Sequence, residues 1–154
     1  MRQQSIKTER GPVIHLETPD LLKRARYELS RHHPVLLRVS GTAMQPALDD
    51  GDLVTVEPVN AQSVRAGDIV LYQSLRDTAL IHRIVRMEAR SSGRFMVTRG
   101  DACATTDVPV PIHHVMGRVT SIDRDGETIA VETHETGFRA WWRGLLARVF
   151  GTER

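Results

Sequence analysis

Residues 35–57 read VLLRVSGTAMQPALDDGDLVTVE, and this stretch contains two short apolar runs separated by a loop. The runs at 35–39 and 53–57 are typical of β-strands, whereas the loop between them contains glycine and proline, which interrupt regular structure. We therefore expect two strands joined by an irregular loop.

Five further β-like runs follow along the chain. They are separated by turn residues, and Asp125-Gly126 between the last two is a strong β-hairpin signal. No helical segments alternate with these runs, which disfavours a parallel, doubly wound sheet. The sequence predicts a mainly β fold, either a small barrel or a folded sheet. The runs are 68–73, 79–87, 95–99, 115–123 and 127–133.

One amphipathic helix is expected before the strands and another after them. Thr18 is predicted as the N-cap of a helix over 19–32, which Pro34 terminates. From Gly137 the pattern is helical again, with apolar residues on one face and arginines beside it. We therefore divide the chain into an N-terminal segment 1–17, a β domain 18–136 that includes the leading helix, and a basic amphipathic C-terminal helix 137–154.

The composition is that of an ordinary folded domain. The 154 residues are 40% hydrophobic and 26% charged, which suffices for one core without a structural metal or disulfides. Cys103 is the single cysteine, and its spacing from His113 and His114 matches no zinc site. The formal net charge of +2 does not indicate nucleic-acid binding. We predict no metal, no cofactor and no nucleic-acid partner.

The sequence predicts neither a membrane-spanning segment nor a secretory signal. No window holds eighteen consecutive apolar residues. Residues 138–150 place Trp141 and Trp142 beside an aliphatic face and arginines, which is typical of a helix lying on an anionic membrane surface. Docking of that face onto the β domain is the alternative. We expect a location in the cytoplasm or at the inner face of the membrane.

Several short motifs occur in a particular order after the first strand. Together they resemble the signal peptidase I superfamily of serine endopeptidases, which includes the LexA-type self-cleaving repressors. The resemblance spans about residues 35–120 and implies a small folded β-sheet or barrel. The motifs are Gly41-Thr42-Ala43-Met44-Gln45-Pro46, Gly67-Asp68, Ile81-His82-Arg83, and Gly100-Asp101 with Asp107 six residues after Asp101.

The first motif matches the superfamily box Gly-x-Ser-Met-x-Pro at Gly41, Met44 and Pro46. The resemblance implies that these residues and Thr42 lie where substrate binds. Ala43 stands where the family has its nucleophilic serine, and a methyl group cannot attack a carbonyl. Two origins of Ala43 are open: a substitution that inactivates an enzyme, and a natural loss of the nucleophile.

The later motifs imply a base and an acid. His82 stands where the endoplasmic-reticulum and archaeal branch has histidine instead of lysine, so by resemblance it would be the general base. Asp107 would orient its imidazole, with Asp101 in support. Asp52 and Asp68 each follow a glycine, and we predict turn roles for both.

The implied partner is a peptide or protein segment in extended conformation, bound as an added strand. Two functions are open: an endopeptidase that cuts after small residues and is inactive as written, and a natural pseudopeptidase that binds the same segment. A LexA-type regulator is disfavoured, because the residues before the first strand leave no room for a winged DNA-binding domain and the base is not lysine. We predict that His82 lies within about 2.6–3.2 Å of Asp107 and that Ala43 faces the same cleft.

Overall fold

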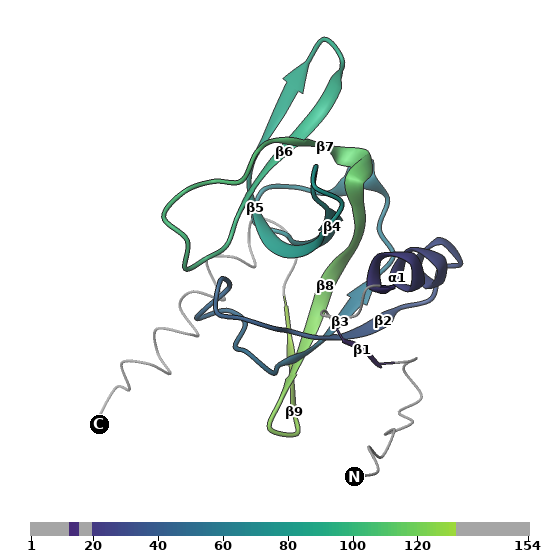
Figure 1. Cartoon of the computed structure of the whole chain (residues 1–154), viewed down its shortest axis with the longest axis vertical. Helices are drawn as coiled ribbons and strands as arrows, with labels where there is room; N and C mark the ends of the chain where they lie inside the picture. The colour runs from purple at the N-terminus through teal and green to yellow at the C-terminus, as the bar shows by residue number, and fades with distance from the viewer. Residues whose placement is uncertain (1–12, 16–19, 132–154) are drawn as a thin grey trace.

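The computed structural model describes residues 13–15 and 20–131 of the chain, which form a curled β-sheet with one α-helix packed on it (Figure 1). The α-helix is α1 (Leu21–Ser30), and two short 3-10 helices are η1 (Ala61–Ser63) and η2 (Ile112–His114). The strands are β1 (Val13–His15), β2 (Val35–Arg38), β3 (Leu53–Glu57), β4 (Ile69–Gln73), β5 (Ala79–Arg90), β6 (Gly93–Arg99), β7 (Val110–Pro111), β8 (Val115–Arg124) and β9 (Glu127–Ala130).

The sheet bends around β8. Its strand order is β1-β2-β3-β8-β4-β5-β6-β7, and β9 pairs with β8. Arg118 of β8 has register partners on both sides, Glu57 of β3 and Val70 of β4. Register shifts in both of these pairings are the kind of irregularity that bends a strand. The sheet therefore closes partway into a half-barrel, which confirms the predicted mainly β fold (Figure 1).

All seven predicted strands are present, and the Asp125-Gly126 hairpin joins β8 to β9. Both turn residues have positive φ, 52° and 81°, as a type I′ turn requires. Two short strands, β1 and β7, were not predicted. The pairing of β1 with β2 is parallel, and α1 connects the two strands. Strands of two or three residues are too short to show a periodicity in the sequence.

The helix α1 is shorter than the predicted 19–32. Asp20 occupies the N-cap position without a side-chain cap hydrogen bond, and the predicted N-cap Thr18 lies outside the described residues. The helix buries Leu21, Ala25 and Leu29 in the core, and it contacts β8 and β2.

The C-terminal end of α1 is set by backbone geometry. His32 has a φ of 61°, and its amide donates to the carbonyl of Leu29 at 3.0 Å. The amide of His33 donates to the carbonyl of Glu28, also at 3.0 Å. This pair of bonds is a Schellman motif, with His32 in the left-handed position that glycine usually takes. The helix therefore stops at Ser30, before Pro34 can interrupt it.

Gly117 allows the helix and two strands to meet. A Cβ at this position of β8 would lie 2.5 Å from Val56 Cγ1 and 3.3 Å from Leu29 Cδ1. A side chain there would push β3 or the helix outward.

Asp52 and Asp68 are buried carboxylates with structural partners. Asp52 is 4% exposed and accepts two hydrogen bonds from Arg124, at 3.0 Å from Nε and 2.6 Å from Nη2. Asp68 accepts the amide of Arg65 at 3.0 Å and lies 3.6 Å from Arg118 Nη1. Asp52 thereby ties the end of the loop after β2 to β8.

The predicted C-terminal helix over 137–154 lies outside the described residues. Among the residues that the structure describes, no helix has the length and apolar character needed to cross a bilayer.

Candidate active site

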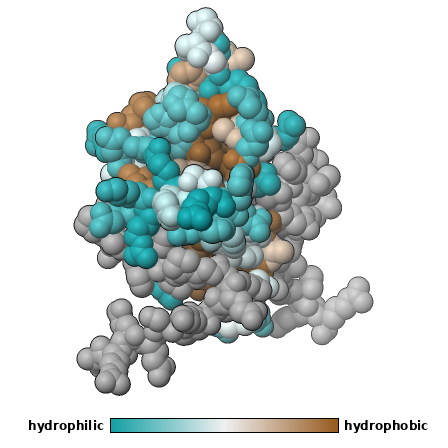
Figure 2. Space-filling view, turned by 90° about the vertical axis from the view of Figure 1, so that its right-hand side faces the viewer, coloured by the Kyte–Doolittle hydropathy of each residue, from teal (hydrophilic) through white to brown (hydrophobic). Residues whose placement is uncertain are grey.

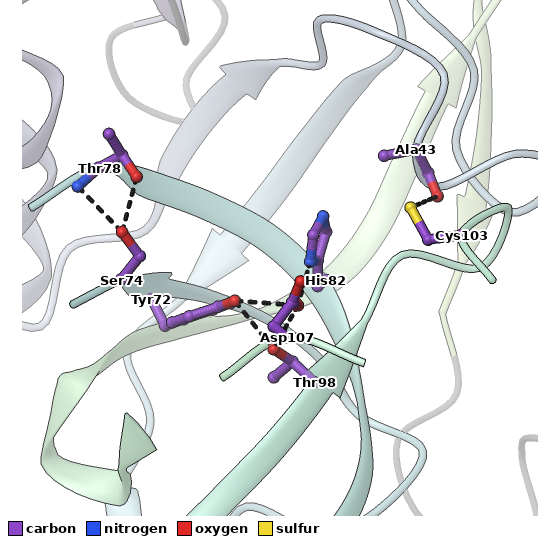
Figure 3. Close-up of polar contacts among 8 residues, drawn as sticks. All are labelled: Ala43, Tyr72, Ser74, Thr78, His82, Thr98, Cys103 and Asp107. Carbon is purple, nitrogen blue, oxygen red and sulfur yellow. Dashed lines mark hydrogen bonds and ion pairs between the residues drawn. The ribbon is translucent and has the colours of Figure 1, made fainter. Parts of the chain in front are cut away.

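His82 of β5 and Asp107, in the segment between β6 and β7, meet directly. Nδ1 of His82 lies 2.5 Å from Oδ2 of Asp107. Because an ionised carboxylate only accepts hydrogen bonds, Nδ1 carries the proton and Nε2 is the basic nitrogen. The imidazole is 12% exposed, and its second nitrogen points away from Asp107 (Figure 3). The pair has the geometry of an imidazole base oriented by a carboxylate.

Two buried hydroxyls hold Asp107 in place. Thr98 Oγ1 donates to Oδ2 of Asp107 at 2.7 Å, and the Tyr72 hydroxyl donates to the same oxygen at 3.2 Å. The two hydroxyls are 2.8 Å apart. The amide of Asp107 also donates to the carbonyl of Thr98 at 2.8 Å. The three hydrogen bonds that involve Asp107 keep its carboxylate directed at the imidazole (Figure 3).

Tyr72 is a neutral donor in this network. Burial raises the pKa of its phenol well above the usual range, the hydrogen bond with Thr98 lowers it, and the charge of Asp107 raises it further. The phenol therefore keeps its proton at neutral pH.

No role for Thr98 or Tyr72 was predicted from the sequence. Val70 of β4 is the register partner of His82, and Tyr72 lies two residues further along the same face of β4. Thr98 is the partner of Ile84, two residues after His82. Tyr72 could have been found as a hydroxyl residue two positions after Val70, the register partner of His82. That inference requires the strand register, which the sequence does not show.

Asp101 is bound to Arg83 and does not contact His82 in the described part of the chain. Its carboxylate accepts from Arg83 Nε at 2.9 Å and from Nη2 at 2.8 Å, and both side chains are largely buried. Neighbouring side chains of a strand point to opposite faces, so Arg83 and His82 project from opposite faces of β5. The predicted support of the base by Asp101 is not a contact of this structure.

The turn that contains Asp101 contacts residue 43. The amide of Ala102 donates to the carbonyl of Ala43 at 2.9 Å, and Cys103 Sγ lies 4.0 Å from the same oxygen (Figure 3). A Cβ at Gly100 would lie 2.6 Å from that oxygen. The close approach thus requires glycine, and the ion pair of Asp101 anchors the turn.

Ala43 and His82 line the same cleft, which has a volume of about 270 Å³. One wall comes from the loop after β2 and the other from the start of β5. The cleft is mostly apolar, and its apolar side chains are Val39, Met44, Leu48, Ala79, Leu80 and Ile81.

Of the four predicted substrate-binding residues, two line the cleft and two do not. Gly41 and Met44 line the cleft, and the amide of Gly41 donates to Asp50 Oδ1 at 2.8 Å. Thr42 and Pro46 are exposed but do not line it.

Among residues 13–15 and 20–131, no group of three or more His, Cys, Asp and Glu side chains is arranged to hold a metal ion. His113 and His114 lie on η2, whereas Cys103 lies against Ala43.

The comparisons with known proteins cover this same region. A family model described as Peptidase S24-like matches residues 14–120. The signal peptidase complex catalytic subunit SEC11 of Scheffersomyces stipitis is 32% identical over 78 residues, 50% of this chain and 46% of the relative. SEC11 of Yarrowia lipolytica is 32% identical over 100 residues, 64% of this chain and 54% of the relative.

The human signal peptidase complex catalytic subunit SEC11C is 31% identical over 70 residues, 44% of this chain and 36% of the relative. The chain spans about half the length, or less, of these curated relatives. No solved structure gives a significant match. Because the family match takes in more than half of the chain, including residue 43, His82 and Asp107, the chain belongs to the Peptidase S24-like family.

Proposed function

We propose that this protein has the architecture of a signal-peptidase-like serine endopeptidase and binds an extended peptide or leader segment. With this sequence it does not hydrolyse the segment, because Ala43 occupies the position of the nucleophile. The observation that carries the proposal is the 2.5 Å contact between His82 and Asp107, beside a cleft that Ala43 also lines. The names of the relatives, catalytic subunits of a signal peptidase complex, support a leader segment as the substrate class.

The retained residues correspond to two parts of a serine hydrolase. A hydroxyl on residue 43 would pass its proton to Nε2 of His82 while the oxygen attacks the scissile carbonyl, and Asp107 would stabilise the imidazolium. His82 would then give the proton to the leaving amine. Ala43 lacks the hydroxyl for the first step, so the base and its carboxylate remain without a nucleophile at this position.

The backbone at residue 43 supplies a candidate oxyanion donor. Within the described residues, no group accepts a hydrogen bond from the Ala43 amide. Such a donor contributes about 3 kcal/mol to transition-state stabilisation when it points at the developing oxyanion. The same amide would orient the carbonyl of a bound, uncleaved peptide.

An edge of β5 supports binding of the substrate as an added strand. Residues 79–82 pair with β4 on one side, whereas β6 pairs with β5 only from Arg83 onward. In the described part of the chain, no strand covers the other side of 79–82, and these residues line the cleft. A peptide strand on this edge would bring its backbone beside His82, and the small apolar cleft would favour small side chains.

A natural pseudopeptidase is the second candidate, and Ala43 itself favours it. In that case the same edge and cleft bind the peptide, and no cleavage follows.

The decisive experiment adds the hydroxyl. Ala43→Ser is expected to cleave peptides with small residues before the scissile bond at least ~10³-fold faster than the parent, and His82→Ala in that background should abolish the gain. Ala79→Ser is the matched control, because it adds a hydroxyl to the opposite wall of the cleft. If Ala43→Ser stays inert while the parent binds peptides, the result supports the pseudopeptidase. If the parent binds no peptide and Ala43→Ser neither binds nor cleaves one, the result contradicts both candidates.

Peripheral membrane contact through residues 138–150 is part of this proposal. The test is sedimentation with anionic vesicles, in which binding should weaken with salt. Truncation at Gly137 should weaken the binding, and equal binding after truncation would contradict it.

A further inference from the structure

A second cavity, separate from the cleft of His82, is lined by four basic side chains and no acidic one. It has a volume of about 390 Å³ and lies between α1, residues 58–60, η2 and the start of β8. It shares no lining residue with the cleft. Figure 2, which faces the side of the molecule that carries α1, shows hydrophobic residues in recesses framed by hydrophilic ones. The basic residues are Arg26, His32, His113 and His114.

Gln73 fixes two of these basic groups. Nδ1 of His114 lies 2.8 Å from the backbone oxygen of Gln73, and a carbonyl only accepts, so Nδ1 carries the proton. Arg26 Nη2 donates to the side-chain oxygen of the same glutamine. Nε2 of His114 has no hydrogen-bond partner among the described residues. It becomes a donor when the ring takes up a second proton.

The two adjacent histidines form a pair that an anion would stabilise. The ring centroids of His113 and His114 are 4.8 Å apart, and two protonated imidazoles at this separation repel each other. An anion between them would remove the repulsion and favour protonation of both rings.

Among the described residues, no carboxylate lines the cavity beside this pair. From α1 and its C-terminal end the cavity receives Arg26 and His32, while residues 58–60 and β8 add no charged side chain. Two carboxylates of neighbouring segments are used elsewhere. Glu28 pairs with His33 at 3.1 Å, and Asp77 accepts from Gln73 Nε2 at 2.8 Å.

We propose that this cavity binds a phosphate group, with uptake of a proton by the histidine pair. Phosphate oxygens accept several hydrogen bonds at once, as the guanidinium and two imidazoles require. Apolar walls from Leu29, Val59 and Met116 would contact the carbon skeleton that carries the phosphate. The phosphate belongs either to a soluble monoester or to a lipid headgroup, and the two sources are separated by experiment.

The test uses the full chain and two probes, glycerol 3-phosphate in calorimetry and phosphatidylcholine vesicles containing phosphatidic acid in sedimentation. The variants are Arg26→Gln and the double change His113→Gln with His114→Gln. The matched control is His33→Gln, an exposed histidine outside the cavity. We expect both cavity variants to lose at least tenfold in affinity and the control to match the parent. If the cavity variants lose affinity for glycerol 3-phosphate in calorimetry, the phosphate belongs to a soluble ester. If they lose affinity only for the vesicles, it belongs to a lipid headgroup.

Sulfate isolates the protonation step, because its own charge is constant over the pH range in which histidine ordinarily titrates. The parent should bind sulfate at least tenfold more tightly at about pH 5.5 than at about pH 8, with proton uptake measured in buffers of different ionisation enthalpy. The double histidine variant should lose both effects. Equal binding of all probes by the double variant and His33→Gln overturns the site, and pH-independent sulfate binding by the parent overturns the proton uptake.

Discussion

The carbonyl oxygen of Ala43 accepts a hydrogen bond of 2.9 Å from the amide of Ala102. This bond joins the loop that carries the nucleophile position to the turn after β6. The buried ion pair between Asp101 and Arg83 holds this turn in place. Because Arg83 directly follows His82 in β5, the strand that carries His82 also anchors the turn that contacts residue 43.

Gly100→Ala tests this contact. A methyl group at residue 100 would lie 2.6 Å from the Ala43 oxygen and 2.8 Å from Cys103 Sγ, so the turn and the loop must separate. We expect the free energy of unfolding to fall by about 1–3 kcal/mol in urea denaturation. In the Ala43→Ser background, peptide cleavage should fall as well. Ala102→Ser, at an exposed position of the same turn, keeps the amide donor and serves as the control. Unchanged stability and cleavage in Gly100→Ala would show that the contact is not tight.

The two acidic residues of the fourth motif, Asp101 and Asp107, are expected to differ in the consequences of removing their charge. Asp101→Asn leaves Arg83 buried without its carboxylate, which should lower the free energy of unfolding by about 3–5 kcal/mol. Asp107→Asn, in the Ala43→Ser background, should lower cleavage by about 10⁴-fold, because the amide no longer fixes the imidazole tautomer. Urea denaturation and peptide cleavage are measured on both variants. The reverse result, with cleavage more sensitive at Asp101 than at Asp107 after correction for stability, would exchange their roles.

The strands could be predicted from the sequence because they rest on local patterns of apolar and turn residues, and the position of His82 in the chain follows from its motif. Seven apolar runs between turn residues give seven strands. The resemblance predicted that Asp107 contacts His82, but the sequence could not predict that Asp101 pairs with Arg83 instead of supporting the imidazole. The spacing of Asp101 and Asp107 in the sequence is the same whichever of them contacts His82. Only the fold of the segment after β6 brings Asp107 to His82 and Asp101 to Arg83.

The hydroxyls behind Asp107 were missed for a related reason. Tyr72 and Thr98 come from strands on either side of β5, so their approach to one carboxylate depends on register. A shift of one residue in either pairing would turn the hydroxyl to the opposite face.

Thr98→Val is expected to weaken this support without changing the size of the side chain. Thr98 is fully buried, and its hydroxyl donates to Asp107 at 2.7 Å. Its removal leaves a part-buried carboxylate oxygen with fewer donors, which should cost about 1–3 kcal/mol in unfolding free energy. Thr120→Val in β8 is the control, because no hydrogen bond of its hydroxyl occurs among the described residues. Equal stability of the two variants would mean that the Thr98 hydroxyl adds nothing to the network.

Tyr72 gives the protein a predictable response to alkaline pH. Burial raises the pKa of its phenol in the folded state, whereas the unfolded chain ionises tyrosine near the ordinary value of about 10. The stabilisation is therefore complete below about pH 10 and is lost as pH rises above it, because only the unfolded state releases the proton. The slope contributed by Tyr72 is at most about 1.4 kcal/mol per pH unit, and Tyr72→Phe should lack it.

The change in ultraviolet absorbance when tyrosine ionises checks the same assignment. The protein has two tyrosines, and Tyr72 is 1% exposed. Below about pH 11 the folded parent and folded Tyr72→Phe should show the same rise in absorbance, because Tyr72 stays protonated. In urea, where both tyrosines of the parent ionise, its rise should be twice that of the variant. A larger rise in the folded parent than in folded Tyr72→Phe would mean that the phenol ionises inside the fold, and the hydroxyl could not then be the neutral donor that holds Asp107 against His82.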